Sequence, residues 1–126
     1  MPPSSRQRTD SAEASSEARK LSKPKNEANL LLEIHLEEIG VGWVSEYKFC
    51  PFRKWRFDYL LKPIKNQIAV EIEGGTWVSG RHNRGKGFLA DMEKYREAAA
   101  MGYKVYRFST QEVLYGTAKR FIELHV

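Results

Sequence analysis

The segment WRFDYLLKPIKNQIAVEIEGG, residues 55–75, constrains the fold more than any other part of the chain. Two runs that alternate between apolar and polar residues flank the sequence LKPIKN, in which Pro63 and Asn66 favour a turn. Runs of this kind are typical of strands that are half buried. We therefore expect two neighbouring strands, over residues 55–61 and 67–73.

Carboxylates recur on one face of this strand pair. Successive side chains of a strand point to opposite faces, so Glu71 and Glu73 share a face and folding the strands together brings Asp58 beside Glu71. Like charges this close repel each other, and a cation that neutralises them would remove the repulsion. Oxygen ligands favour Mg²⁺ or Mn²⁺ over zinc. The other face of the first strand is expected to carry its aromatic side chains, Trp55, Phe57 and Tyr59.

The alternative to a metal site is that these carboxylates lie on the acidic, solvated face of an edge hairpin. If the carboxylates do form a metal site, replacing Asp58 or Glu71 by alanine should relieve repulsion in the metal-free protein. The stability of that protein should then stay unchanged or rise slightly.

A basic, glycine-rich segment, GGTWVSGRHNRGKGF, follows at residues 74–88. Glycine allows backbone amides to approach an anion closely, so we expect a loop that clamps phosphates over the metal site. A solvated turn without a ligand is the alternative. The segment is not a nucleotide-binding phosphate loop, because Gly87 stands where Ser or Thr would follow the lysine. The candidate nucleic-acid contacts are Arg81, His82, Arg84 and Lys86 in this segment, and Arg53, Lys54 and Arg56 at the start of the first strand.

The composition suits a small protein with a polyanionic partner. The net charge is +5 over 126 residues, which is enough for one domain with a modest core. Residues 1–24 contain almost no large apolar side chain and are expected to be disordered, leaving residues 25–126 as the folded domain. No apolar run is long enough to span a membrane, and the single Cys50 excludes an internal disulfide. We expect an intracellular, cytoplasmic protein without a membrane partner.

The remaining patterns indicate an α/β order of elements. Gly40 and Gly102 are expected to end the two longer helices, and Ser109 and Glu112 form a capping box that opens a last helix. The apolar residues of that last helix are expected to face inward: Val113, Leu114, Phe121 and Leu124. The expected elements are a helix over 26–39, strands over 45–49, 55–61 and 67–73, a helix over 88–101, a strand over 103–108 and the last helix.

Several short motifs carry a family resemblance that spans residues 26–115. FRKWRFDYL, IAVEIEGGTW, GRHNRGKGF, DMEKY and GYKVYRFS resemble the PD-(D/E)XK nuclease superfamily, and more closely small phage and prophage endonucleases related to very-short-patch-repair-type nucleases. The resemblance implies a restriction-endonuclease-like αβββαβ core with a small mixed sheet flanked by helices. It also implies hydrolysis of nucleic-acid phosphodiesters, with DNA as the expected polymer. Asp58, Glu71, Glu73 and the backbone carbonyl of Ile72 would hold Mg²⁺ or Mn²⁺.

The chain departs from the superfamily pattern at Glu73, where the motif has lysine. In the assignment that we favour, Glu73 itself orients or deprotonates the attacking water and Lys94 assists. In the other, Lys94 has taken over the role of the missing lysine from the following helix. Glu27 resembles an additional acidic ligand that some of these nucleases contribute from the first helix. Glu33 and Glu37 compete for that role.

Three other functions stay open at this point. The chain could be a nucleic-acid-binding module that has lost catalysis, although its intact carboxylates argue against this. It could be a resolvase specific for junctions or flaps, or an enzyme that acts on nucleotide phosphates. Duplex, single-stranded and branched substrates, DNA and RNA, and a monomer or homodimer are not distinguished by the sequence.

Overall fold

The computed structural model describes residues 26–74 and 76–126, and within 76–86 it describes the backbone only. The expected order of three strands between two helices, followed by a strand and a helical end, is present. The α/β fold class is therefore confirmed. The elements are α2 (Glu27–Glu38), β2 (Trp43–Lys48), β3 (Arg56–Leu61), the short 3₁₀ helix η1 (Ile64–Asn66), β4 (Ile68–Glu73), α3 (Thr76–Ala100), β5 (Lys104–Ser109), α4 (Thr110–Leu114) and α5 (Thr117–His125).

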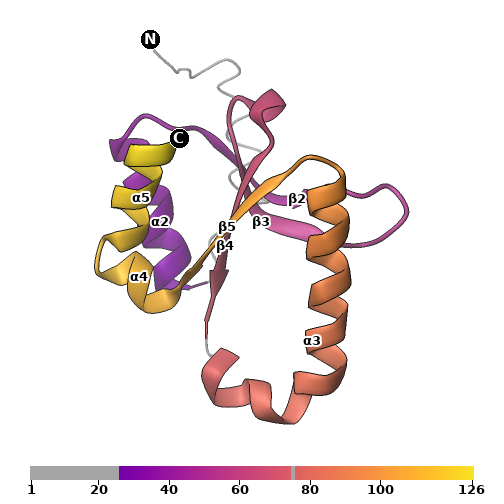
Figure 1. Cartoon of the computed structure of the whole chain (residues 1–126). Coiled ribbons are helices and arrows are strands. Elements are labelled where there is room, and N and C mark those ends of the chain that lie inside the picture. Colours follow the sequence, from indigo (N-terminus) through magenta and orange to yellow (C-terminus); the bar gives the residue numbers. More distant parts are fainter. Residues whose placement is uncertain (1–25, 75) are drawn as a thin grey trace.

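The strands form one mixed sheet of four in the order β2-β3-β4-β5. The first three are antiparallel to their neighbours, and β5 runs parallel to β4 because α3 makes the crossover between them. Helices α2, α4 and α5 lie on one side of the sheet and α3 lies on the other (Figure 1). The small mixed sheet flanked by helices is thus as the sequence predicts.

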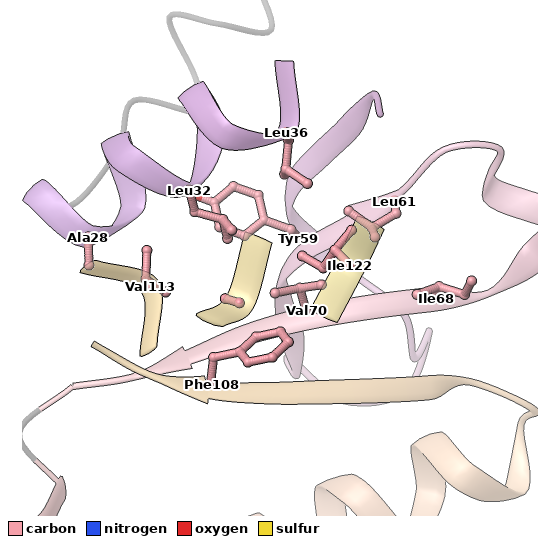
Figure 2. Close-up of a cluster of buried hydrophobic side chains, with 11 residues drawn as sticks. Ala28, Leu32, Leu36, Tyr59, Leu61, Ile68, Val70, Phe108, Val113 and Ile122 are labelled. Atoms are coloured by element: carbon pink, nitrogen blue, oxygen red, sulfur yellow. The ribbon is translucent and has the colours of Figure 1, made fainter. Parts of the chain in front are cut away.

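The larger core fills the side of α2, α4 and α5, which we call the three-helix face. Ala28, Leu32 and Leu36 recur at every fourth position of α2, so they form one stripe, and all three are buried against the sheet. Figure 2 shows this stripe above the inward side chains of the strands. Gly40 follows the helix with a φ of +78° and ends it, as expected. The buried residues of this core from the other elements are Tyr59, Leu61, Ile68, Val70, Phe108, Val113, Ala118 and Ile122.

A smaller core lies on the side of α3, which we call the α3 face. The rings of Phe49 and Phe57 stack there with centroids 4.1 Å apart, and Ala98 is the fully buried α3 residue against them. The small alanine side chain lets the helix approach the sheet closely. Cys50, Leu60 and Ala69 complete the buried set.

The alternation of side chains is regular along β4 but not along β3. On β4, Ile68, Val70 and Ile72 pack at the three-helix face, which leaves the carboxylates on the α3 face, as expected. On β3, however, Phe57 lies in the core of the α3 face and Tyr59 in the core of the three-helix face. The expectation that the aromatic residues of β3 share a face is therefore wrong.

A local distortion of the β2–β3 ladder explains this change of face. The ladder aligns Ser45 with Tyr59 and Tyr47 with Phe57, and it is interrupted between these two pairs, where Glu46 lies opposite Asp58. Glu46 has a left-handed φ of 54°, which an L residue adopts only at an energetic cost. The chain twists at this point. Alternation continued from Phe57 would therefore place every residue after Asp58 on the wrong face.

Helix α3 begins at Thr76, twelve positions before the expected start. The basic glycine-rich segment is therefore helical in its backbone and is not a loop. Each glycine costs a helix about 1 kcal/mol relative to alanine, but extending an existing helix costs far less than nucleating one. Gly102, with a φ of +95°, marks the end beyond α3 as predicted.

The last helix is divided in two. The capping box of Ser109 and Glu112 opens α4 as expected, with both of its hydrogen bonds present. Gly116, with a φ of +85°, then separates α4 from α5. Leu114 and Leu124 are exposed, contrary to the prediction. In α4 it is Val113 that faces inward, so the adjacent Leu114 points away from the core, and the break at Gly116 changes which side of α5 faces inward. In the part of the chain that the structure describes, no helix combines the length and apolarity needed to cross a membrane.

Candidate functional site

Glu71 is the centre of a polar cluster on the α3 face. It lies on β4 beyond the apolar core, and only 5% of the residue is exposed. Two consecutive α3 residues contact its two carboxylate oxygens. Lys94 Nζ donates to Oε2 over 2.8 Å, and the hydroxyl of Tyr95 donates to Oε1. The carboxylate is therefore held on both sides by the helix that covers it.

The environment of Glu71 favours its neutral form. Burial raises the pKa of this carboxyl group, and the neighbouring charge of Asp58 raises it further. The hydrogen bonds from Lys94 and Tyr95 act in the opposite direction without cancelling the effect of burial. Burial and the contact with Glu71 likewise raise the pKa of Tyr95 far above the usual value for a phenol, so this hydroxyl remains a donor.

Asp58 lies on the neighbouring strand, close enough for its charge to act on Glu71. The ladder between β3 and β4 ends at the pair Tyr59 and Val70. Beyond this pair the Asp58 carboxylate accepts a hydrogen bond from the backbone N–H of Ile72 over 2.9 Å and so bridges the two strands. The structure thus brings Asp58 and Glu71 together, as the sequence predicts.

Glu73 has a different partner. Arg107 Nε on β5 donates to Glu73 Oε2 over 2.9 Å, and its guanidinium carbon lies 4.4 Å from the centre of the Tyr95 ring. Arg107 was not among the residues that we predicted for the site. The signal that would have found it is the parallel register of the two strands, which pairs Arg107 with Glu71. A sequence does not reveal that register directly.

The acidic residues of α2 do not join this cluster. Glu27, the predicted additional ligand, is exposed at the first turn of the helix, and Glu37 is also exposed. Glu33 is the α2 carboxylate that reaches the sheet, where it accepts a hydrogen bond from the buried Tyr59 hydroxyl over 2.8 Å. Burial raises the pKa of Glu33 as well.

The basic residues predicted to bind nucleic acid divide into two groups. Arg53 lies over the Trp55 ring at 3.9 Å and pairs with Glu93 of α3 over 3.0 Å, and Arg56 is exposed at the start of β3. In the other group the backbone belongs to the first half of α3, but the side chains lie outside the described part of the structure. Those residues are Arg81, His82, Arg84 and Lys86.

The donor set fits a hard divalent cation that binds through few protein ligands. Among the described residues, no three His, Cys, Asp or Glu side chains converge, so the four predicted carboxylates do not form a complete cage. Mg²⁺ commonly uses only one or two protein carboxylates and takes its other ligands from water and substrate phosphates. Asp58 and Glu71, which are adjacent and rich in oxygen, match that requirement. They lack the nitrogen and sulfur ligands that zinc prefers.

A scan against protein-family models and searches of curated proteins and of solved structures found no match for this chain. The chemistry of the cluster must therefore be argued from its own geometry. Two adjacent carboxylates can hold a cation, and the ammonium and guanidinium groups beside them can hold an anion. An arrangement that binds a cation and an anion side by side suits the hydrolysis of phosphate esters.

Proposed function

We propose that this protein is a Mg²⁺- or Mn²⁺-dependent endonuclease that hydrolyses phosphodiester bonds in DNA, with a site of the PD-(D/E)XK type. The observation that carries the proposal is the adjacent pair Asp58 and Glu71 on diverging strands, with Lys94 2.8 Å from the buried Glu71. These are the three kinds of group for which that site is named, although the lysine comes from α3 instead of β4.

The two carboxylates would hold the cation. A bound cation of this kind lowers the pKa of a water molecule and offsets the negative charge of the phosphate. Asp58 is kept in place by the Ile72 N–H, and Glu71 by Lys94 and Tyr95. Each carboxylate thus has at least one fixed hydrogen bond before any ligand binds. Pre-organised ligands avoid part of the cost of reorganisation during the reaction.

Lys94 is better placed than Glu73 for the role of the missing lysine. Its ammonium group contacts Glu71 directly and is only 15% exposed, so it borders the position of a bound cation. There it can hold a nonbridging phosphate oxygen or the attacking water in line with the scissile bond. Glu73, by contrast, is engaged by Arg107. The proposal therefore gives the lysine role to Lys94, while direct action of Glu73 on the water stays a testable alternative.

Helix α3 supports a polymeric substrate over a free nucleotide. It carries Lys94 and Tyr95 near one end and the basic residues of its first half toward the other, and its first half lies past the end of β4 (Figure 1). At a rise of about 1.5 Å per residue, Lys86 and Arg81 lie no more than about 12 and 20 Å along the helix from Lys94. At about 3.4 Å per nucleotide along one strand, these separations correspond to roughly four to six nucleotides. A single nucleotide would not reach these residues.

Cleavage of a substrate panel tests the proposal. Linear duplex, single strand, flap, four-way junction, RNA and free nucleotides would be incubated with Mg²⁺, Mn²⁺ or EDTA. The variants are Asp58→Asn and Glu71→Gln, and the matched control is Glu37→Gln, which changes an exposed carboxylate on the other side of the sheet.

We expect metal-dependent endonucleolytic cleavage of DNA by the wild type and by the control. Each site variant should lose at least about 10³-fold in rate, because the charge stabilisation lost is several kcal/mol. Preferential cleavage of flaps or junctions would favour the resolvase. Binding without cleavage under every condition would favour the inactive module, and release of phosphate from nucleotides alone would reject a polymer substrate.

The salt dependence of binding tests the basic half of α3 separately. If Arg81 and Arg84 contact two phosphates, replacing both with alanine should lower the slope of log affinity against log salt by about 1.8 for duplex DNA. Different sequences should be weakened almost equally, because phosphate contacts position a protein without reading bases. An unchanged slope would remove these residues from the interface while leaving the carboxylate site intact.

A further inference from the structure

We propose that Arg107 is a catalytic residue that contacts the scissile phosphate, and that Glu73 and Tyr95 are the positioning residues that hold it for this contact. This inference rests on the proposed function and deepens it, since it assigns a phosphate subsite next to the carboxylate pair. It also gives Glu73 a role in which it does not orient or deprotonate the attacking water molecule.

The guanidinium group of Arg107 is fixed on two sides. Its Nε donates to Glu73 over 2.9 Å, and its central carbon lies 4.4 Å from the centre of the Tyr95 ring. Ion pairs of exposed side chains contribute little to stability when they act alone. Here the second contact, with the aromatic ring, restricts the orientation of the guanidinium group as well as its position.

The part of Arg107 that is not fixed is available to an anion. Nε accounts for one of the five N–H donors of an arginine. Within the described residues, the two terminal nitrogens have no hydrogen-bond acceptor, and 44% of the side chain is exposed. A guanidinium group held by its Nε edge and open at its outer edge can donate two parallel hydrogen bonds to a phosphate.

Arg107 borders the carboxylate pair. It is the register partner of Glu71 on the parallel neighbouring strand, and Tyr95 touches both residues through its hydroxyl and its ring. Asp91 of α3 is the other charged group close enough to act on this guanidinium. A phosphate bound through the cation at Asp58 and Glu71 would therefore lie beside Arg107.

The carboxyl groups of Asp58, Glu71 and Glu73 outnumber the two cations of Lys94 and Arg107, and Asp91 is a further carboxyl group near Arg107. A divalent cation held by Asp58 and Glu71 would offset negative charge both of these groups and of a phosphodiester. In this arrangement Arg107 offsets phosphate charge at the position where the two metal-binding carboxylates would repel it.

Variants of Arg107 separate catalytic contact from structural support. We expect Arg107→Ala to lower kcat by about 10²-fold, the loss typical of one donor to developing charge. Arg107→Lys should recover little of this, because an ammonium group keeps the charge but lacks the planar fork and the stacking on Tyr95. Added guanidinium should restore part of the rate of Arg107→Ala, whereas methylammonium should not. The matched control is Arg120→Ala, an exposed arginine of α5 on the other side of the sheet.

A binding measurement that needs no cleavage completes the test. In the Glu71→Gln background with EDTA, adding Arg107→Ala should lower the salt slope for a duplex oligonucleotide by about 0.9, the value of one phosphate contact. Thermal melting of each variant shows whether the fold persists. Arg107→Ala with the wild-type rate, or a reduced rate with an unchanged salt slope and no guanidinium rescue, would overturn the inference and leave the nuclease proposal standing. If the wild type cleaves nothing while the slope still falls, the nuclease proposal fails and the phosphate contact stands.

Discussion

On the three-helix face of the sheet, α2, α4 and α5 bury an almost wholly apolar layer, whereas on the α3 face a single helix covers a mixture of aromatic rings and charges. The main polar contact within the first layer is Tyr59 with Glu33 and Asn29. The second layer holds Glu71 buried among ionic and hydroxyl partners. Burial of apolar area stabilises a fold, whereas burial of charge costs free energy unless every group is paired.

The three-helix face therefore holds most of the buried apolar side chains, and the α3 face would carry the chemistry of the proposed function. Among the α3 residues whose side chains the structure describes, those that contact the sheet closely are Ala98, Tyr95 and Lys94, in the last turns of the helix. Its earlier side chains Phe88, Leu89 and Met92 are exposed.

The largest effect on stability is expected at the three-helix face. Leu32→Ala should lower the free energy of unfolding by about 2–5 kcal/mol, because Leu32 is fully buried and the neighbouring helices cannot close the cavity completely. Leu30→Ala on the same helix, at a residue that is 49% exposed, should change it by no more than about 0.5 kcal/mol. Urea unfolding measures both. Below the melting temperature, the cleavage rate per folded molecule should be the same in both variants, and a rate that fell with Leu32→Ala would contradict the separation of the faces.

On the α3 face, Lys94 and Glu73 should differ in their effect on rate. We expect Lys94→Met to lose about 10²–10³-fold in kcat, the loss typical of a donor placed at developing charge. Glu73→Gln should lose about tenfold, because it acts through Arg107 and a neutral amide can still accept that hydrogen bond. Single-turnover cleavage distinguishes the two, with the exposed Lys104→Met as control. If Glu73→Gln is inactive and Lys94→Met nearly normal, Glu73 handles the water directly.

The buried Glu71 on the α3 face and the half-buried Glu33 on the three-helix face should make stability depend on pH. A folded state that raises the pKa of Glu71 above 4.5 binds its proton more tightly than the unfolded chain does. Stability from this group is therefore greatest at low pH and is lost as pH rises from about 4.5 through the folded pKa. Glu71→Gln should remove this part of the dependence, and so should Glu33→Gln for its own raised pKa. Unfolding at pH 4–8 with and without Mn²⁺ separates them, because the metal should alter the profile of the wild type and of Glu33→Gln but not that of Glu71→Gln.

The smallest effect is expected at the projecting part of α3. A methyl group at Gly87 would meet no atom within 4 Å, so Gly87→Ala should stabilise the helix by about 0.5–1 kcal/mol. Gly74→Ala is the matched opposite, because its added methyl group would lie 2.9 Å from the Thr110 hydroxyl oxygen and should destabilise the protein. Thermal melting measures whether each substitution raises or lowers the stability of the protein. No gain at Gly87 would favour the loop that the sequence suggested over the helix.

The sequence predicted the elements well because their patterns are local. The alternation of β4, the helix stops at Gly40 and Gly102 and the capping box at Ser109 each depend on a few neighbouring residues. The pair of Asp58 and Glu71 also followed from local alternation and a short connection. The start of α3 was missed because glycine propensity is a weak determinant beside the cooperativity of helix extension.

The parts of the site that sequence reasoning missed depend on tertiary contacts. Helical spacing gave Lys94 a face but did not show that this face meets Glu71, and the register that brings in Arg107 depends on the crossover through α3. The structure also reverses the expectation that replacing Glu71 by alanine leaves the stability of the metal-free protein unchanged or slightly higher. Its loss would leave the Lys94 ammonium and the Tyr95 hydroxyl without their acceptor in a nearly buried position, so Glu71→Ala should destabilise the metal-free protein.

Glu46, which has a left-handed φ and lies opposite Asp58, divides the β2–β3 hairpin into two halves. Odd-numbered residues point to one face of the sheet in the first half and to the other face in the second. Odd-numbered positions of β3 belong to the α3 face before Asp58 and to the three-helix face after it. A strand of six residues thereby contributes an aromatic ring to each of two separate cores. Insertion or deletion of one residue normally moves every side chain of a strand to the opposite face. Here a second change at the twist would return only the residues on one side of Asp58 to their original face. The two cores are thus linked through a single backbone conformation, and changes to the length of this hairpin would be transmitted to both faces at once.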